Sequence, residues 1–337
     1  MIMKIAVLGA GSWGTAIARL LANKGYDLVM YTNSKDQYKV LQESKENPAY
    51  LPGVSLPENL SYTLSLKCVE EAEIIVLAVP TSACREVLGK IKEYSLKEDV
   101  ILVNLAKGIE NKSLKRVSEI SKEILGDLPF VCLSGPSHAE EVAKDIPTCV
   151  TVACQDMAHA YKIQNIFSTK NFRVYTNHDL VGVELGGALK NIIALAAGIS
   201  DGLKFGDNTK AALMTRGMYE ISKLAIEMGG NPQTFHGLAG MGDLIVTCTS
   251  MHSRNRRCGI LIGQGLSVEE ASRQVGMVVE GVKTTKSAYD LAKKLSVDMP
   301  ITNKLYGVLY EDKNPLEAVK ILMTRDSKDE IEEVFFL

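Results

Sequence analysis

The sequence predicts an α/β fold in which a doubly wound parallel sheet is followed by an all-α domain. Three observations support this prediction. The first half of the chain alternates short runs of Val, Ile and Leu with helical stretches, which is the pattern of βαβ units. A glycine-rich turn joins the first strand to the first helix. From about residue 180 onward, helical periodicity takes over and strand-like runs are nearly absent.

The expected strands are nearly continuous runs of branched apolar residues, as in a parallel sheet that is covered on both faces. They are Lys4–Leu8, Asp27–Tyr31, Ile74–Val79, Val100–Leu105, Phe130–Leu133 and Thr148–Val152. Helices are expected between them, among others at Thr15–Lys24, Ser82–Lys92 and Ser113–Leu125. We therefore expect a sheet domain over residues 1–180 and a helical domain over residues 181–337.

Length and composition fit two ordinary globular domains. The chain has 337 residues, of which 46% are hydrophobic, and a formal net charge of −2 without a long run of like charge. This balance argues against a nucleic-acid partner. Seven cysteines show neither C-x-x-C nor metal-ligand spacing, so we expect reduced thiols in a cytoplasmic protein and no metal, with a catalytic thiol as the alternative. We expect neither a membrane span nor a signal peptide.

The first strand leads into the turn Gly9-Ala10-Gly11-Ser12-Trp13-Gly14 and then into a helix. In this context Gly9 allows the tight turn, Gly11 lets a pyrophosphate approach the backbone, and Gly14 lets the helix pack closely on the strand. The N–H groups at the start of the helix would face the phosphates. We therefore expect a Rossmann-type domain that binds NAD or NADP, with a purely structural glycine turn as the alternative.

The end of the second strand bears on the choice between NAD and NADP. An acid there would bind the ribose 2′-OH and repel a 2′-phosphate. The sequence instead reads Tyr31-Thr32-Asn33-Ser34-Lys35-Asp36. Asn33 and Ser34 can donate to either ribose and Lys35 favours a phosphate, so the use of NADPH is permitted. Asp36 is expected in solvent at the start of the next helix.

Three further motifs follow predicted strands, where ligands bind in open α/β sheets. They are Val79-Pro80-Thr81-Ser82, Ala106-Lys107-Gly108 and Ser134-Gly135-Pro136-Ser137. Lys107 is suited to a carbonyl or phosphate oxygen, and the alternative is a solvated loop lysine. Ser137 followed by Glu140 fits a capping box, so we expect Ser137 to cap the next helix, whose N–H groups also suit an anion.

The segment from Leu180 to Gly198 contains only one acid, Glu184, and one base, Lys190. We therefore expect a helix that is buried nearly all round. A lysine in such a helix must either pair with an acid or give up its proton more readily. The second case suits a general acid/base for carbonyl reduction. A structural ion pair is the alternative.

A glycine-rich turn that ends in Asp243 precedes three arginines in Ser253-Arg254-Asn255-Arg256-Arg257, at an expected helix start. The planar guanidinium group of arginine holds phosphate well, and a helix start adds N–H donors. We therefore expect a phosphate-bearing substrate. A solvated basic loop is the alternative.

Together these motifs resemble those of the bacterial NAD(P)-dependent glycerol-3-phosphate dehydrogenases, along nearly the whole chain. The matching stretches are Gly9–Thr15, Asn47–Pro52, Ala106–Gly108, Ser134–Ser137, Gly182–Asn191, Gly240–Leu244, Ser253–Arg256 and Val279–Gly281. The resemblance implies reversible reduction of dihydroxyacetone phosphate by NADH or NADPH to sn-glycerol 3-phosphate, a precursor of glycerophospholipids. It leaves open whether the enzyme is a homodimer.

The resemblance also implies roles for individual residues. Lys190 is the acid/base on the substrate oxygen, and Lys107 and Asp243 orient the substrate and tune that lysine. The implied substrate contacts are Lys107, Gly135, Ser137, Lys190, Asn191, Asp243, Thr247, Ser253, Arg254 and Asn255. The cofactor contacts, including those expected from the glycine turn and the second strand, are Gly9, Gly11, Ser12, Trp13, Gly14, Asn33, Tyr50, Lys107, Ala139, Arg254, Val278 and Glu280.

One position departs from the family pattern. Many relatives carry Arg or His where this chain has Asn33, so a strong preference for NADPH is not expected. Two other functions remain as alternatives at this point. A dehydrogenase of β-hydroxyacids would not need the arginine cluster, and a dinucleotide sensor without catalysis would leave the buried Lys190 without a role.

Overall fold

The computed structural model describes residues 2–327, 329 and 330, which form two compact units. Unit 1 comprises Met1–Lys107 and Lys115–Leu180, and unit 2 comprises Gly108–Leu114 and Val181–Leu337. The segment Gly108–Leu114 belongs to unit 2 because Ile109 is buried in the apolar core of that unit. Ser287 also donates a hydrogen bond of 3.0 Å from its hydroxyl group to the Ile109 carbonyl.

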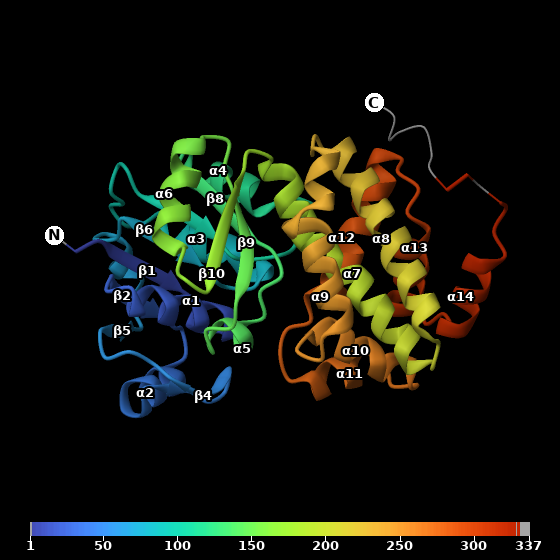
Figure 1. Cartoon of the computed structure of the whole chain (residues 1–337), viewed down its shortest axis with the longest axis horizontal. Coiled ribbons are helices and arrows are strands. Elements are labelled where there is room, and N and C mark those ends of the chain that lie inside the picture. The colour runs from blue at the N-terminus through green and yellow to red at the C-terminus, as the bar shows by residue number, and fades with distance from the viewer. Residues whose placement is uncertain (1, 328, 331–337) are drawn as a thin grey trace. The chain divides into compact units, whose positions relative to one another are not determined.

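Unit 1 is built on an eight-stranded sheet with the strand order β10-β9-β8-β7-β6-β1-β2-β5 (Figure 1). Its strands are β1 (Lys4–Leu8), β2 (Asp27–Tyr31), β5 (Leu60–Thr63), β6 (Ile74–Leu77), β7 (Ile101–Asn104), β8 (Phe130–Ser134), β9 (Thr148–Ala153) and β10 (Phe172–Asn177). β1 pairs in parallel with both β2 and β6, so the order of the strands reverses at β1. Ligands bind at such a reversal in doubly wound sheets.

All six expected strands are present, and the doubly wound arrangement is confirmed. The parallel prediction is wrong for one of them, because β9 runs antiparallel to β8. β5 and β10 were not expected. Both are edge strands in which buried and exposed residues alternate, so neither shows the continuous apolar run of a central strand. A separate hairpin of β3 (Glu46–Asn47) and β4 (Leu51–Ser55) was also missed.

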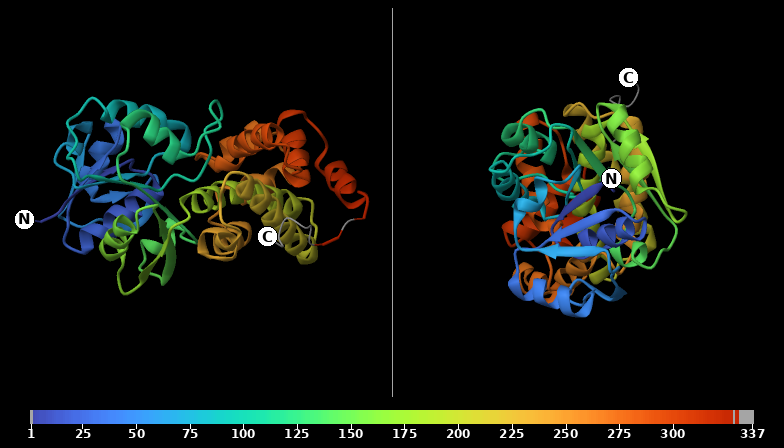
Figure 2. Two further views of the ribbon diagram at one scale, coloured as in Figure 1. Left: turned by 90° about the horizontal axis from the view of Figure 1, so that it is seen from above. Right: turned by 90° about the vertical axis from the view of Figure 1, so that its left-hand side faces the viewer.

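Helices cover both faces of this sheet. They are α1 (Ser12–Asn23), α2 (Lys35–Ser44), the 3-10 helix η1 (Leu66–Val69), α3 (Thr81–Ile91), α4 (Val117–Leu125), α5 (Ala139–Val142) and α6 (Met157–Phe167). Figure 2 shows α3 and α4 on one face of the sheet and α1 and α6 on the other. α4 begins four residues later than Ser113, because Leu114 has a φ of +59° and interrupts the expected helix.

The described residues of unit 2 form helices and connecting loops without a strand, as expected for the chain beyond residue 180. Its helices are α7 (Leu180–Gly202), α8 (Asp207–Glu227), η2 (Pro232–His236), η3 (Leu238–Gly242), α9 (Asp243–Thr249), α10 (Arg254–Gly263), α11 (Val268–Val275), α12 (Glu280–Leu295), α13 (Pro300–Tyr310) and α14 (Pro315–Met323). α7 carries a large share of the apolar core of this unit.

The burial expected for α7 is confirmed. Among the described residues it is the one helix that is long and apolar enough to cross a membrane, but 83% of its apolar stretch is buried within the protein. Its composition is therefore that of a core helix. All seven cysteines are free thiols, and five of them are buried.

Candidate active site

The glycine turn between β1 and α1 has the geometry that the sequence predicts. Gly9 has a φ of +117°, and a Cβ atom there would lie 2.8 Å from the Ala78 carbonyl oxygen. A Cβ atom on Gly14 would lie 2.1 Å from the Gly9 carbonyl oxygen. Around Gly11, by contrast, no described atom beyond its own chain neighbours lies within 4 Å of such a Cβ atom. Gly9 and Gly14 are thus required by the turn and the packing, and Gly11 leaves the backbone open to a ligand.

The start of α1 adds hydrogen-bond donors to this open backbone. The Thr15 N–H donates to the Gly11 carbonyl at 2.9 Å, which begins the helix. The N–H groups of the three residues before Thr15 consequently have no partner within the helix. Such a cluster of N–H groups binds phosphate. The turn therefore fits the pyrophosphate of a dinucleotide.

Trp13 and Tyr50 are the two aromatic residues expected at the cofactor. The ring of Trp13 packs against that of Phe172, with the centroids 6.4 Å apart. Its indole Nε1 is buried, and within the described part of the chain it has no hydrogen-bond partner. Tyr50 follows β3 and is 39% exposed. A buried donor without a partner is a group that a bound ligand can satisfy.

The segment after β2 presents polar side chains to solvent. Asn33 and Lys35 are exposed, and so is Asp36 in the first turn of α2, as expected. Ser34 is the N-cap of α2, since its hydroxyl oxygen accepts a bond of 3.2 Å from the Gln37 N–H. Asn33 and Lys35 are therefore the side chains here that are accessible to a ribose substituent.

Lys107 and Ser137 meet at one backbone oxygen. The Lys107 ammonium group donates to the Gly135 carbonyl at 3.0 Å, and so does the Ser137 hydroxyl group, also at 3.0 Å. Gly135 has a φ of +136°, and a Cβ atom on it would lie 3.0 Å from Val150 Cα. The structure thus brings three predicted site residues together, and Lys107 is a half-buried, bonded lysine and not a solvated one.

The expected capping role of Ser137 is wrong. α5 begins at Ala139, a buried residue also expected at the cofactor, and His138 occupies the N-cap position. The Ser137 hydroxyl group bonds back to Gly135 and not forward to the helix. A helix of only four residues also leaves little for a capping box to stabilise.

Lys190 is the centre of the second cluster. Its ammonium group forms an ion pair with Asp243 and donates a hydrogen bond of 2.7 Å to the Thr247 hydroxyl group. Thr247 in turn donates to the Asp243 carbonyl at 2.6 Å. Lys190 is 6% exposed and Asp243 only 1%. Of the two cases open to a buried lysine, the structure shows pairing with an acid, which holds the ammonium group in place with protons that it can donate.

Close backbone packing brings these three side chains together. Gly186 lies one turn before Lys190 on α7, and a Cβ atom on it would lie 2.6 Å from the Ala239 carbonyl oxygen. The π-helical turn η3 therefore packs directly on α7. α9 follows η3 at once, so Asp243 and Thr247, four residues apart, lie on the same face of α9 beside Lys190.

The arginine loop is the start of α10, as expected. Ser253 caps the helix, since its hydroxyl oxygen accepts a bond of 3.2 Å from the Arg256 N–H. Arg254, the first residue of the helix, is exposed. The Arg256 guanidinium group instead binds the Asp201 carboxylate at 2.8 Å and the Thr249 carbonyl at 2.7 Å. Arg254 is thus presented to solvent at a helix start, whereas Arg256 holds α10 to the end of α7.

Asn255 connects three helices beside the expected site residues. Its side-chain N–H group donates to the Asn191 side-chain oxygen on α7, and its own side-chain oxygen accepts from the Gly281 N–H on α12, both at 2.8 Å. Glu280 is the first residue of α12, and Val278, two residues earlier, is 39% exposed. The link therefore fixes the segments that carry Lys190, Arg254 and Glu280 within unit 2.

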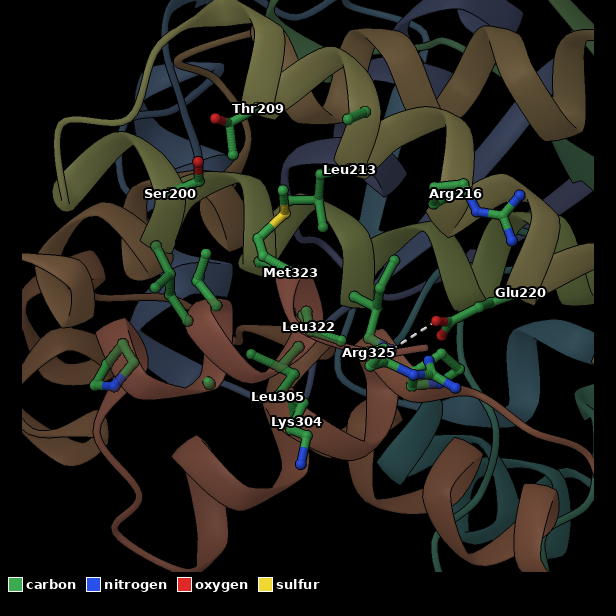
Figure 3. Close-up of a pocket in the computed structure, with 18 of the residues that line it drawn as sticks. Ser200, Thr209, Leu213, Arg216, Glu220, Lys304, Leu305, Leu322, Met323 and Arg325 are labelled. Carbon is green, nitrogen blue, oxygen red and sulfur yellow. Dashed lines mark hydrogen bonds between the residues drawn. The ribbon is translucent and has the colours of Figure 1, made fainter. Parts of the chain in front are cut away.

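A cavity of about 460 Å³ in unit 2 has mostly apolar walls formed by α7, α8, α13 and α14 (Figure 3). None of the predicted site residues lines it. Its wall includes Glu220, which is 3% exposed and accepts bonds of 2.6 and 3.2 Å from the N–H groups of Ile301 and Thr302. Burial raises the pKa of Glu220 to about 7 despite these bonds. Among the described residues no group of His, Cys, Asp and Glu side chains is suited to hold a metal ion.

Two family models match the chain. Residues 4–160 match the N-terminus of NAD-dependent glycerol-3-phosphate dehydrogenase, and residues 179–320 match its C-terminus. Glycerol-3-phosphate dehydrogenases (NAD(P)+) from Pelotomaculum thermopropionicum and from Thermoanaerobacter sp. (strain X514) are 57% and 56% identical to the chain. Each alignment covers 98% of this chain, and 96% and 99% of the relative, respectively.

A solved structure agrees with these sequence comparisons. The crystal structure of glycerol-3-phosphate dehydrogenase from Coxiella burnetii has a TM-score of 0.93 and is 39% identical. The match covers 96% of this chain and 99% of that one. The chain belongs to the family of NAD-dependent glycerol-3-phosphate dehydrogenases.

Proposed function

We propose that the protein reduces dihydroxyacetone phosphate reversibly to sn-glycerol 3-phosphate with NADH or NADPH, and so supplies glycerophospholipid synthesis. The observation that carries the proposal is the Lys190 ammonium group, buried in the core of unit 2 and held by Asp243 and Thr247. Names of relatives that are 57% and 56% identical support the same reaction.

Unit 1 is proposed to hold the dinucleotide. The Gly9–Gly14 turn and the start of α1 would bind the pyrophosphate. Trp13, Tyr50 and Ala139 would contact the rest of the cofactor. Arg254, Val278 and Glu280 are proposed as further cofactor contacts. When bound, the nicotinamide supplies the hydride for the carbonyl carbon.

Lys190 is proposed as the general acid for the reduction. It would give a proton from Nζ to the oxygen that becomes the new hydroxyl group, and take it back in the reverse reaction. Asp243 and Thr247 fix the position of Nζ in a buried setting, where an ammonium group also stabilises a developing alkoxide strongly.

The remaining site residues are proposed to orient the substrate. The exposed Arg254 and the first N–H groups of α10 suit its phosphate. Lys107 and Ser137, both held by the Gly135 carbonyl, would add donors to substrate oxygens. The roles proposed for Asn191, Ser253 and Asn255 are indirect, because these residues fix the helices that carry the other site residues. Positioning of this kind lowers the entropic part of the barrier.

We also propose that the enzyme acts in the cytoplasm, without a nucleic-acid partner and without stable membrane insertion. The free thiols support the compartment, the net charge of −2 argues against a nucleic-acid partner, and the burial of α7 argues against membrane insertion. The alternatives of a monomer and a homodimer are separated by light scattering of the purified protein.

Turnover of the purified protein tests the proposed reaction. With dihydroxyacetone phosphate, we expect oxidation of NADH or NADPH and formation of sn-glycerol 3-phosphate. Activity on a β-hydroxyacid alone would identify a different dehydrogenase. Tight cofactor binding without turnover on any of these substrates would identify a sensor.

A further inference from the structure

The carbonyl oxygen of Ala10, between the first two glycines of the turn, is held by two side-chain amides. Gln37 Nε2 donates to it at 2.7 Å and Asn47 Nδ2 at 2.9 Å. Two donors use both lone pairs of a backbone carbonyl. We call Gln37 and Asn47 the amide pair. Neither residue has a role in the proposed reaction as described so far.

The amide pair belongs to a buried network with its polar groups satisfied. Asn47, which is 1% exposed, also donates to the Thr15 hydroxyl group at 2.8 Å. The side-chain oxygen of Gln37 accepts a bond of 2.5 Å from the Thr32 hydroxyl group. A buried, satisfied network of this kind allows one arrangement of its members. The orientation of the Ala10 carbonyl is therefore fixed by two donors, each of which is held in turn by a further hydrogen bond.

The position of this carbonyl sets the direction of a neighbouring donor. In the planar trans peptide between Ala10 and Gly11, the N–H of Gly11 points opposite to the carbonyl. Glycine has no Cβ to restrict rotation of this peptide, so the sequence of the turn alone leaves its orientation loosely defined. The amide pair removes that freedom beside Gly11, the glycine of the turn at which an added Cβ atom would meet open space.

We propose that Gln37 and Asn47 are positioning residues for the dinucleotide, because they orient the Ala10–Gly11 peptide so that the Gly11 N–H is ready for a pyrophosphate oxygen. This inference rests on the proposed binding of the cofactor at the glycine turn. A donor that is oriented before binding costs no ordering entropy when the ligand arrives, and the gain appears as affinity.

The same hydrogen bonds also connect segments of unit 1 that are distant in the sequence. Thr32 directly follows β2, Gln37 lies in α2, and Asn47 belongs to β3, three residues before Tyr50. Through the Ala10 carbonyl these segments are tied to the glycine turn, so the pieces of unit 1 proposed to contact the cofactor share one set of hydrogen bonds.

The variants Gln37→Met and Asn47→Ala test the inference. Gln37→Met keeps the length of the half-buried side chain and removes its amide. Unit 1 offers two controls. Gln164 donates to the Val174 carbonyl at 2.8 Å, and Asn59 donates to the Ala22 carbonyl at 2.9 Å, near the far end of α1. Gln164→Met is the matched control for the equally half-buried Gln37, and Asn59→Ala removes an amide-to-backbone bond of an exposed asparagine away from the glycine turn.

The dissociation constant of NADPH and the steady-state constants separate the outcomes. We expect Gln37→Met to raise the Kd roughly three- to tenfold, which corresponds to the loss of one hydrogen bond. Asn47→Ala should raise it at least as much. At saturating cofactor, kcat should stay within about twofold, and both controls should bind NADPH as the wild type does.

Two results would overturn the inference. One is an unchanged Kd in folded Gln37→Met. The other is an equal rise in Kd for Gln37→Met and Gln164→Met, which would assign the amide pair a general structural role. If the wild-type protein bound neither NADPH nor NADH, the proposed function itself would fail, so the two failures are distinguishable.

Discussion

Lys190 and Asp243 form an ion pair inside unit 2, where their side chains are 7% and 1% exposed. Water therefore screens this pair little, and each charge depends on the other. Thr247 completes the arrangement, because it accepts from Lys190 and donates to the Asp243 backbone. The same ion pair contributes to the stability of the folded protein and holds the proposed proton donor. Substitutions of the two residues can separate these roles.

Removal of Asp243 should cost stability as well as activity. In Asp243→Asn the buried Lys190 ammonium group loses its counter-charge, and breaking a buried pair from one side costs about 3–5 kcal/mol. Denaturant unfolding should therefore show a large decrease in the free energy of unfolding. The double variant Lys190→Met, Asp243→Leu should recover much of that loss while remaining inactive. Equal stability of Asp243→Asn and the wild type would contradict the assigned pairing.

Arg254 and Arg256 should differ in what they support. Arg254→Ala should raise the KM for dihydroxyacetone phosphate roughly ten- to a hundredfold, since bonds to charged groups contribute about 1.5–3 kcal/mol. Its unfolding midpoint should stay close to that of the wild type, because Arg254 is exposed. Arg256→Ala should lower the unfolding midpoint, because it breaks the bond to Asp201. An unchanged KM in Arg254→Ala would remove that residue from the phosphate site.

The choice of cofactor should respond to the exposed residue Asn33. Asn33→Arg places a guanidinium group at the end of β2, where a 2′-phosphate is recognised in this fold. We expect the ratio of kcat/KM for NADPH to that for NADH to rise about tenfold or more. Thermal stability should not change, since Asn33 is exposed. Side-by-side titrations with the two cofactors measure the ratio. An unchanged ratio would place the 2′ group elsewhere.

Glu220 should make stability depend on pH near neutrality. Its pKa is raised from 4.5 to about 7 by burial. Between these values the folded state binds more protons than the unfolded state, so its contribution is present below the unfolded pKa and is lost as the pH rises through about 7. A shift of this size corresponds to roughly 3 kcal/mol.

The comparison with Glu220→Gln isolates this group. From about pH 5 to about pH 8 the free energy of unfolding of the wild type should fall relative to that of the variant. Urea unfolding at a series of pH values measures the difference between the two proteins, in which the other titrating groups cancel. A difference that stays constant with pH would show that Glu220 does not titrate in this range.

Features with a strong local cause could be predicted from the sequence. Gly9 and Gly14 are each required by a close backbone contact. Glycines at this spacing between a strand and a helix are typical of such a turn, so both could be predicted. α7 was predicted because a long apolar segment with a single acid and a single base is typical of a helix that is buried nearly all round. The helix start at the arginine loop was also expected, and the Ser253 cap is its local cause in the structure.

Features that depend on distant residues could not be predicted. The direction of β9 is defined by its antiparallel pairing with β8. The residues of β9 alone do not indicate which strand it pairs with or in which direction. The Ser137 hydroxyl group prefers the Gly135 carbonyl to the helix start, a competition between two local bonds that the spacing to Glu140 does not reveal. The roles of Gln37 and Asn47 arise only when three separate segments meet at Ala10.

The variant Lys190→Arg tests the central claim most directly. Arginine keeps the positive charge beside Asp243, but its guanidinium group remains protonated and cannot serve as the acid. Folding is verified by an NADPH dissociation constant and an unfolding midpoint close to those of the wild type. With that verified, kcat for dihydroxyacetone phosphate should fall by about 10²–10⁴, the usual contribution of general acid catalysis. A kcat within a few-fold of the wild type would contradict the claim that Lys190 is the proton donor.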